Sequence, residues 1–234
     1  MNKTQVLALL KENRNERGIA NWKKRGHGDG GLKSFGIGLT VLRKLAKQIG
    51  RDQTLARTLW EANIYDAKVL GLLIDDPKQL TREQAEEQVE DLKGGMLAHV
   101  FSGCDAPLAK APFAFELACD WIESQDNRRK SCGWELLYEL SKKNTEGMDD
   151  AFLLGCIDRV RKEIDGEPTW VRMAMANALV GIGKRNKKLN RAAARVAKQV
   201  GPIDFSDVSA SKCDPFDPHK HLTSDYLKKK LDRR

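Results

Sequence analysis

Apolar side chains recur every three or four residues along most of this 234-residue chain. This spacing places them on one face of a helix, whereas a strand would alternate every second residue. The pattern predicts helices over residues 4–14, 39–49, 52–60, 64–74, 113–122 and 189–200. A further helix is expected to open at Thr81, because Thr81 and Gln84 have the spacing of a capping box. Since no stretch alternates with period two, we expect an all-α protein.

One helix occurs twice in the sequence. Residues 127–144, NRRKSCGWELLYELSKKN, return as residues 169–186, TWVRMAMANALVGIGKRN. Equivalent positions are 42 residues apart, so that Leu137 matches Leu179 and Leu140 matches Ile182. A helical period of roughly 40–47 residues is typical of HEAT and armadillo arrays, whose helix pairs stack because one pair cannot bury its apolar face alone. We therefore predict a HEAT-like helical-repeat solenoid, an α-α superhelix.

The helical pattern ends at residues 201–202, a Gly-Pro pair. We assign residues 1–202 to one HEAT-like domain and residues 203–234 to a polar tail with a basic end, which fits either a disordered nucleic-acid-binding arm or a solubilising extension. Five glycines between Gly26 and Gly36, together with the basic residues 23–25, predict a loop over residues 15–36, after the first helix. This loop is interpreted as a connection rather than a phosphate cradle, because the complete P-loop motif is absent.

Composition adds a partner and a compartment to this picture. A hydrophobic content of 41% supports a real core, and a net charge of +8 with a pI near 9.2 suits a polyanion partner as well as plain solubility. The five cysteines are odd in number, form no C-x-x-C motif, and include Cys132 and Cys156 at apolar helical positions. We therefore expect no disulfides, and we expect the protein to reside in the reducing environment of the cytoplasm. No apolar run reaches membrane length.

Two groups of residues are candidates for contact with nucleic acid. One lies near Trp22, where an aromatic ring beside two lysines can stack on a base. The other lies near the starts of the repeated helices, where cations oppose the helix dipole, which favours them at the C-terminal end. That mild cost favours a function at the surface. The assigned residues are Trp22, Lys23, Lys24, Arg129, Lys130 and Arg172.

Two stretches carry a resemblance to a known family. The first is KSFGIGLTVLRKLAKQIG at residues 33–50. The second is LARTLWEANIYDAKVLGLLIDDP at residues 55–77, with a Trp-Glu pair and a closing Asp-Pro, and the similarity continues to about Pro202. Together they resemble the DNA alkylation repair family of HEAT-repeat DNA glycosylases. The resemblance implies a concave basic groove for duplex DNA. In active members it also implies removal of cationic N-alkylated purines.

The resemblance also implies roles for individual residues. Active members place a tryptophan four residues before a catalytic aspartate, and the matching positions are Phe101 and Asp105. A carboxylate can stabilise the oxocarbenium-like transition state of N-glycosidic cleavage, and a ring face attracts a cationic base. A second aromatic position matches Asn177, which is not aromatic, and a phosphate-binding arginine falls near residues 128–130. Asp105 also fits a turn or a helix cap, and Phe101 also fits the core.

Three functions are consistent with these features. The first is a DNA-binding HEAT-repeat protein that excises cationic N3- or N7-alkylated purines through Asp105, with duplex DNA as partner and with neither cofactor nor metal. The alternative is a non-catalytic module that binds nucleic acid structures or a protein partner, and Asn177 favours it. A scaffold for an acidic protein is the third. Cys213, His219 and His221 are metal-binding residue types without a fourth partner, so no metal site is assigned.

Overall fold

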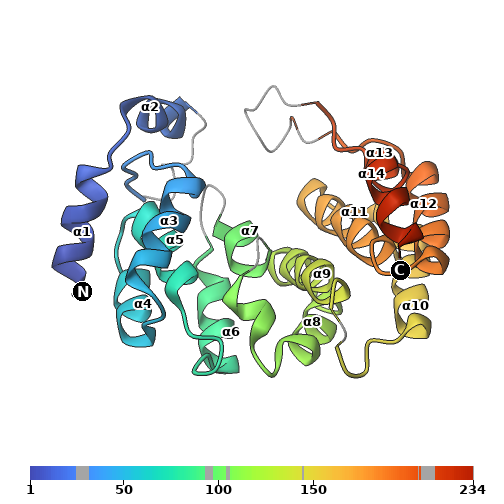
Figure 1. Cartoon of the computed structure of the whole chain (residues 1–234), viewed down its shortest axis with the longest axis horizontal. Coiled ribbons are helices and arrows are strands. Elements are labelled where there is room, and N and C mark those ends of the chain that lie inside the picture. Colours follow the sequence, from blue (N-terminus) through green and yellow to red (C-terminus); the bar gives the residue numbers. More distant parts are fainter. Residues whose placement is uncertain are drawn as a thin grey trace. The chain divides into compact units, whose positions relative to one another are not determined.

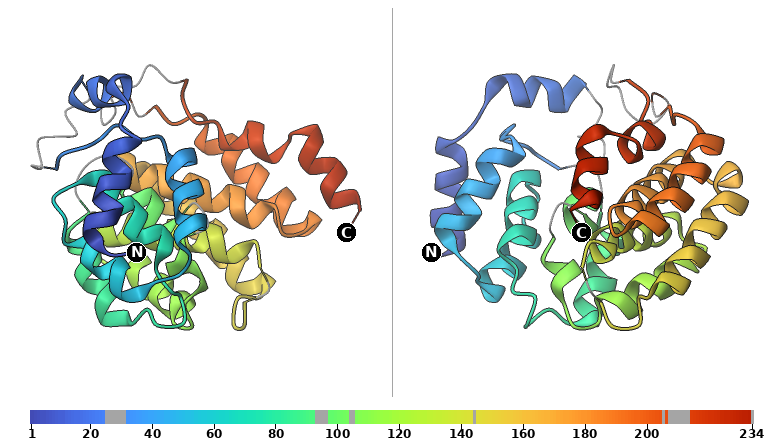
Figure 2. Two further views of the ribbon diagram at one scale, coloured as in Figure 1. Left: turned by 60° about the vertical axis from the view of Figure 1, so that its left-hand side comes forward. Right: turned by 45° about the vertical axis from the view of Figure 1, so that its right-hand side comes forward.

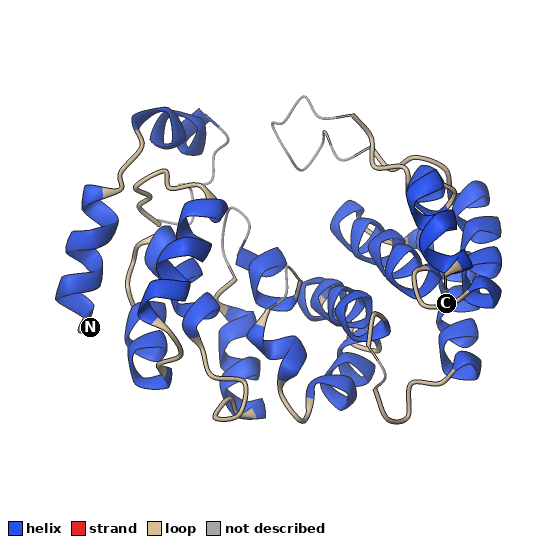
Figure 3. Ribbon diagram, viewed as in Figure 1, coloured by secondary structure: helices blue, strands red, loops and turns tan. Residues whose placement is uncertain are grey.

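The computed structural model of the chain describes residues 1–24, 32–92, 97–103, 106–143, 145–204, 206 and 214–233. The chain divides into two compact units, Met1–Pro112 and Phe113–Arg234. Within the described ranges the secondary structure is helical, apart from two isolated β-bridges (Figure 3). The predicted all-α class is confirmed.

Unit 1 (blue to green in Figure 1) contains seven described α-helices and one short 3₁₀ helix. Their bounds are α1 Lys3–Glu12, α2 Glu16–Lys24, α3 Leu39–Ile49, α4 Gln53–Trp60, α5 Tyr65–Ile74, α6 Arg82–Glu90, α7 Leu97–Ser102 and η1 Pro107–Lys110. The capping box predicted at Thr81 is half formed. The Thr81 hydroxyl accepts from the Gln84 amide at 3.2 Å, but the Gln84 side-chain amide donates to Asp75 instead of returning to the cap.

Helix α5 is the centre of unit 1, and it packs against α1, α3, α4, α7 and η1. Nearly all of its side chains are buried, including Asp66 at 0% exposure. The Asp66 carboxylate accepts hydrogen bonds from the Phe35 amide (2.7 Å), the Ile37 amide (2.9 Å) and the Ser34 hydroxyl (3.0 Å). A buried charge is tolerated when donors surround it in this way. Asp66 therefore fixes the segment before α3 onto the first turn of α5.

The loop predicted from the glycine and basic residues after α1 is wrong for residues 16–24, which form α2. Two glycines allow α2 to pack closely against the segment that precedes α3. A Cβ at Gly18 would lie 2.0 Å from the Gly36 carbonyl oxygen, and Gly36 itself has a φ of +70°. Only glycine allows that approach and that backbone angle without strain. Residues 25–31, which include the other glycines of the predicted loop, lie outside the described ranges.

Unit 2 (green-yellow to red in Figure 1) is also built from helices. Their bounds are α8 Ala114–Ile122, α9 Asn127–Ser141, α10 Asp150–Glu163, η2 Ile164–Gly166, α11 Thr169–Gly183, α12 Lys187–Val200, α13 Pro218–Leu222 and α14 Asp225–Asp232. Helix α9 packs on α8 and α11, and α12 packs on α10, α11 and α13.

The repeated helices of the sequence are α9 and α11, each of 15 residues and 42 positions apart. Three contacts join them in the same order along both helices. Lys130 near the start of α9 binds Glu167 just before α11, Glu135 binds Asn177 at mid-length, and Arg185 after α11 binds the Lys143 carbonyl after α9. The two helices therefore run side by side in the same direction and in register, as stacked repeats do.

The polar tail predicted for residues 203–234 is folded over residues 214–233. Ile203 and Phe216 exchange two backbone hydrogen bonds of 2.8 and 2.9 Å. Leu222, Leu227 and Leu231 are buried at 5% exposure or less, because α13 and α14 are amphipathic and α13 docks on α11 and α12 (Figure 2). A disordered arm is therefore wrong for this part of the tail.

Two further expectations can be compared with the structure. Cys132 and Cys156 are buried at 1% and 5% exposure, as their apolar helical positions predict. Among the described helices, none combines the length and the apolar character that crossing a bilayer requires.

Candidate nucleic-acid interface

The start of α9 presents a capped helix terminus with exposed cations. Asp126 caps it by accepting from the backbone amides of Arg128 (2.9 Å) and Arg129 (3.0 Å). Partial burial opposes ionisation of Asp126, but these two amides and the charges of the same two arginines hold its pKa below the usual value. The Arg128 side chain is 43% exposed and lies 3.6 Å from the Asp126 carboxylate. Its guanidinium is therefore partly accessible from solvent.

Lys130 is bound within the protein rather than presented to solvent. Its ammonium lies 2.9 Å from the Glu167 carboxylate, and the two side chains are only 15% and 14% exposed. This ion pair joins α9 to the turn that precedes α11. The predicted role of Lys130 in holding phosphate would require it to leave Glu167, so the structure gives Lys130 a bracing role between the repeats.

The start of α11 differs from that of α9 by presenting an aromatic ring. Trp170 is 53% exposed. Its equivalent on α9 is Arg128, 42 positions earlier, and because the helices lie in register both positions face solvent on the same side of unit 2. Arg172 is partly buried, and its Nε atom has no hydrogen-bond partner among the residues the structure describes. The start of α11 thus presents one exposed ring and carries one partly buried cation.

At mid-length the two repeat helices are joined by a polar pair. The Asn177 side-chain amide donates to the Glu135 carboxylate at 2.7 Å. Burial raises the pKa of Glu135 to about 7, and the nearby charge of Glu139 adds to this effect, while Asn177 and Lys142 oppose it. The position that resembles the second aromatic of active glycosylases is therefore occupied by an amide engaged inside the protein.

The basic residues at the ends of the repeat helices have structural partners. Lys142 lies 2.6 Å from Glu139 and 4.4 Å from the centre of the Tyr138 ring. Lys184 lies 3.3 Å from the Tyr138 hydroxyl, and Arg185 donates to backbone carbonyls of the preceding repeat. These cations also stand where the helix dipole favours them. Packing accounts for them without a ligand.

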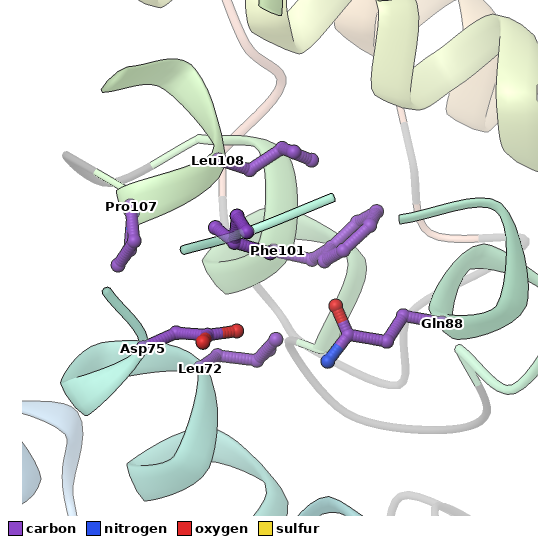
Figure 4. A pocket seen from close by; sticks show the side chains of 7 residues that line it. Leu72, Asp75, Gln88, Phe101, Pro107 and Leu108 are labelled. Atoms are coloured by element: carbon purple, nitrogen blue, oxygen red, sulfur yellow. The ribbon is translucent and has the colours of Figure 1, made fainter. Parts of the chain in front are cut away.

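Phe101 belongs to the core of unit 1. It is 2% exposed and lines a small cavity with Leu72, Asp75 and Gln88 (Figure 4). The cavity has a volume of about 10 Å³, which is the space of one water molecule and far below that of a base. The predicted contact of Phe101 with nucleic acid does not fit this burial. Asp105, the predicted catalytic carboxylate, lies outside the described residues.

The segment around Trp22 also differs from the prediction. Trp22 is only 9% exposed, and its ring centre lies 4.5 Å from that of Tyr65. It packs inwards because α2 is an amphipathic helix rather than a loop. Lys23 and Lys24 are exposed in the last turn of α2, where the helix dipole favours cations. The stacking role assigned to Trp22 is therefore corrected, and the exposed tryptophan is Trp170.

The sequence contained a signal for Trp170 that its apolar character hides. In the 42-residue register, Trp170 coincides with the polar Arg128, so the repeat itself marks position 170 as a surface position. Glu135 was missed because a single glutamate in an amphipathic helix looks like an ordinary solvated residue. As for metals, no cluster of three or more His, Cys, Asp or Glu side chains suited to an ion occurs within the described ranges.

Comparison with known proteins gives three findings. A family model described as DNA alkylation repair enzyme matches residues 6–202. Two curated relatives, the uncharacterized proteins Lin0241 of Listeria innocua and Lmo0209 of Listeria monocytogenes, are each 27% identical over 182 residues, covering 76% of this chain and 78% of theirs.

The third finding is a solved structure with the same fold. It is described as a new family of proteins related to the HEAT-like repeat DNA glycosylases with affinity for branched DNA structures. It superposes with a TM-score of 0.81 and 23% identity, over 100% of this chain and 95% of that one. At this level of identity the likeness concerns the fold, and it confirms the predicted HEAT-like helical-repeat architecture.

Proposed function

Because the chain belongs to the DNA alkylation repair enzyme family, we propose that it binds DNA through the starts of α9 and α11. In this proposal the Trp170 ring stacks on a base, and the guanidinium groups of Arg128 and Arg172 contact phosphates. Guanidinium groups suit phosphate because their donors match its oxygen atoms in a fixed fork geometry. The proposal keeps the predicted role of Arg172, adds Arg128 and Trp170, and gives Lys130 a bracing role.

The observation that carries the proposal is the exposure of Trp170. Trp170 leaves 53% of its surface in water, so a large part of its side chain is accessible to a partner. It lies in the first turn of α11, at the position equivalent to the exposed Arg128 of α9, and this suits an aromatic platform with a cation on the neighbouring repeat. Platforms of this kind bind nucleic acids, and each stacked base contributes roughly 1–3 kcal/mol.

Two observations favour DNA binding without base excision. Phe101, at the position of the first aromatic, is 2% exposed in the core of unit 1, and Asn177, at the position of the second, donates to Glu135. Neither side chain offers a ring to a cationic base. The structural relative has affinity for branched DNA, and we propose branched DNA as the preferred ligand of this chain.

Fluorescence anisotropy with a labelled linear duplex and a labelled four-way junction tests the proposal. Trp170→Ala is expected to weaken binding about tenfold, the equivalent of 1.4 kcal/mol for one lost stacking contact. Trp170→Tyr is expected to restore most of the affinity, because it keeps a ring. Tyr226→Ala, which removes a ring that is 76% exposed on α14, is the matched control and should leave affinity unchanged. Wild-type protein that binds neither DNA would overturn the proposal.

Base excision through Asp105 is the second candidate, and the position of this aspartate, four residues after Phe101, supports it by resemblance. Its test is the release of N-alkylated purines from alkylated duplex DNA by wild type and by Asp105→Asn. Release by wild type that disappears in the variant would establish the glycosylase. Absence of release at an enzyme concentration that saturates the DNA would leave the binding function alone.

A further inference from the structure

The positive charge of this protein is concentrated in one segment. Residues 168–203 contain eight Lys and Arg residues and no Asp or Glu, whereas the whole chain has 41 basic and 33 acidic residues. The other 33 basic residues therefore equal the 33 acidic ones, and the net charge of +8 belongs entirely to this segment. Five of the eight basic residues lie on α12, Lys187–Val200.

Helix α12 separates its apolar and basic residues onto opposite faces. Its buried residues are Leu189, Ala193, Val196 and Ala197, and they pack towards α10 and α11. Lys188, Arg191, Arg195 and Lys198 follow one another at spacings of three, four and three residues, which places them in one stripe on the exposed side. Ten residues of helix place the ends of this stripe about 15 Å apart. We call these four residues the α12 stripe.

The α12 stripe is not neutralised by its surroundings. Arg191, Arg195 and Lys198 form no ion pair with any described residue, and Lys188 lies 3.9 Å from Asp150 with 64% of its side chain exposed. Like charges three and four residues apart on a helix repel one another and destabilise it. Exposed helix faces usually relieve this repulsion by interspersing acidic residues, and α12 has none.

We propose that the α12 stripe is a second phosphate-binding surface, which holds the backbone of one duplex arm while the starts of α9 and α11 hold another. The proposal rests on the proposed DNA binding and deepens it. A single DNA strand carries one phosphate per 3.4 Å of helix axis, so about 15 Å of duplex presents about four phosphates to the four cations. Two surfaces on one protein favour a branched ligand over a linear one, because a second arm then binds intramolecularly.

Other polyanions fit the α12 stripe less well. Helices that lie on anionic membranes insert an apolar face next to the cationic one, but the apolar face of α12 is buried in unit 2. Stable protein interfaces depend on aromatic or apolar anchors at their centre, and the stripe has only cations. A uniform line of phosphates requires neither an apolar face nor an anchor, so nucleic acid is the partner whose chemistry matches.

The test is a variant in which Lys188→Gln, Arg191→Gln, Arg195→Gln and Lys198→Gln are combined. Junction and duplex affinities are measured by anisotropy over a series of salt concentrations. For the junction we expect at least about a tenfold loss of affinity and a slope of log affinity against log salt that is shallower by about 3–4, since each phosphate contact contributes about 0.9. Duplex affinity should fall less, so that the preference for the junction declines.

A control variant removes the same charge from unit 1. It combines substitutions to Gln of four exposed lysines, Lys11, Lys44, Lys47 and Lys78. It is expected to keep the junction preference and most of the salt slope, and an equal loss in this control would overturn the proposal by showing that only net charge matters. Thermal unfolding should show that the stripe variant is at least as stable as wild type, because repulsion is relieved.

Two other outcomes separate the proposal from its premise. If wild type binds DNA and the stripe variant has the same junction affinity and salt slope, the second surface is refuted while the proposed function stands. If wild type binds neither ligand, both fail. Co-sedimentation with phosphatidylserine vesicles is run in parallel, and a stripe-dependent loss of vesicle binding with unchanged DNA binding would overturn the assignment to nucleic acid.

Discussion

Helices α9 and α11 occupy equivalent places in the repeat and differ in the charged residues they carry. Both have 15 residues, and their apolar positions coincide in register. Helix α9 opens on the carboxylate of Asp126 and carries Glu135 and Glu139, whereas α11 opens after Pro168 and contains no acidic residue. The repeat therefore determines the path of the backbone and the buried face, while the polar positions are free to serve different purposes.

The clearest exchange is between Glu139 on α9 and Gly181 on α11, which are equivalent positions. Glu139 is 2% exposed and paired with Lys142. Gly181 lets α11 approach α9, because a Cβ there would lie 2.8 Å from both the Ser141 hydroxyl and the Tyr138 carbonyl oxygen. One copy thus buries a charged pair at the position where the other copy needs the smallest side chain.

The largest expected effect comes from filling this contact. Gly181→Val should lower the free energy of unfolding by about 3 kcal/mol, because the new side chain meets backbone and cannot be accommodated without moving α9. Urea unfolding followed by circular dichroism measures the change. Gly155→Ala on α10 is the control. Nothing lies within 4 Å of its added Cβ, so this change should stabilise by about 0.5–1 kcal/mol through helix propensity. Equal effects at the two glycines would remove close packing as the explanation.

The second largest effect on stability is expected from replacing Glu135, at mid-length of α9. Burial raises the pKa of Glu135 to about 7 from 4.5. A raised carboxyl pKa means that its favourable contribution is complete below the unfolded value of 4.5 and is lost as pH rises towards 7. Glu135→Gln should therefore gain about 2 kcal/mol over wild type between pH 4 and pH 8, at 1.36 kcal/mol per pKa unit and with partial relaxation. Thermal unfolding at both pH values measures this.

The same experiment identifies the role of Asn177. Its amide donates to Glu135 and opposes the rise in pKa, so Asn177→Ala should move the pKa of Glu135 further upward. A stability difference between wild type and Glu135→Gln that does not depend on pH would show that Glu135 is not the titrating group.

A smaller effect is expected at the N-terminal side-chain cap that α9 has and α11 lacks. Asp126→Ala should cost about 1 kcal/mol, because two backbone amides lose their acceptor. The pKa of Asp126 is depressed despite partial burial, so this contribution is present at neutral pH and is lost as pH falls through the folded pKa. Asp126→Asn keeps a capping oxygen and should recover most of the stability at neutral pH. Urea unfolding at pH 7 compares the three proteins, and an equal loss in both variants would argue for charge rather than capping.

The smallest effect on stability is expected at Arg128. Its ion pair with Asp126 is 3.6 Å long and both side chains are substantially exposed, so Arg128→Ala should change the free energy of unfolding by less than about 0.5 kcal/mol. The same variant should weaken DNA binding and make the salt slope shallower by about 1. A loss of stability larger than that of Asp126→Ala would mean that Arg128 belongs to the packing of the helix and not to a DNA surface.

The sequence predicts best those features that many residues define together. The 42-residue register and the apolar spacing locate α3, α5, α9 and α11 to within three residues of their bounds. Helix α2 was missed, because basic residues and nearby glycines conceal an amphipathic helix whose inward residue is Trp22. The docking of α13 and α14 was missed because three leucines spread over a polar tail have no visible partner until the surface of α12 is known.

The sequence predicted the region of the candidate site better than the individual residues within it. The starts of the repeat helices were the predicted area, and Arg129 and Arg172 lie there. Whether a cationic side chain is exposed to solvent or held in an ion pair depends on residues far away in sequence. Lys130 is held by Glu167, 37 positions later, and Phe101 is covered by residues from α5 and α6. Pattern analysis of one helix cannot contain that information.

The docking of α13 on α11 and α12 also buries part of the apolar surface of the last helix pair. A Cβ at Gly183 would lie 2.3 Å from a Leu222 methyl group, and the Asn190 amide donates to both the Gly183 and the Leu222 carbonyl oxygens, at 3.1 Å each. An array of stacked repeats leaves an apolar surface on its last helix pair, to which a further repeat or another copy can add. The C-terminal helices cover that surface with their own leucines and turn charged residues outward. The area that a further repeat would bury is therefore buried here by the chain's own C-terminal leucines.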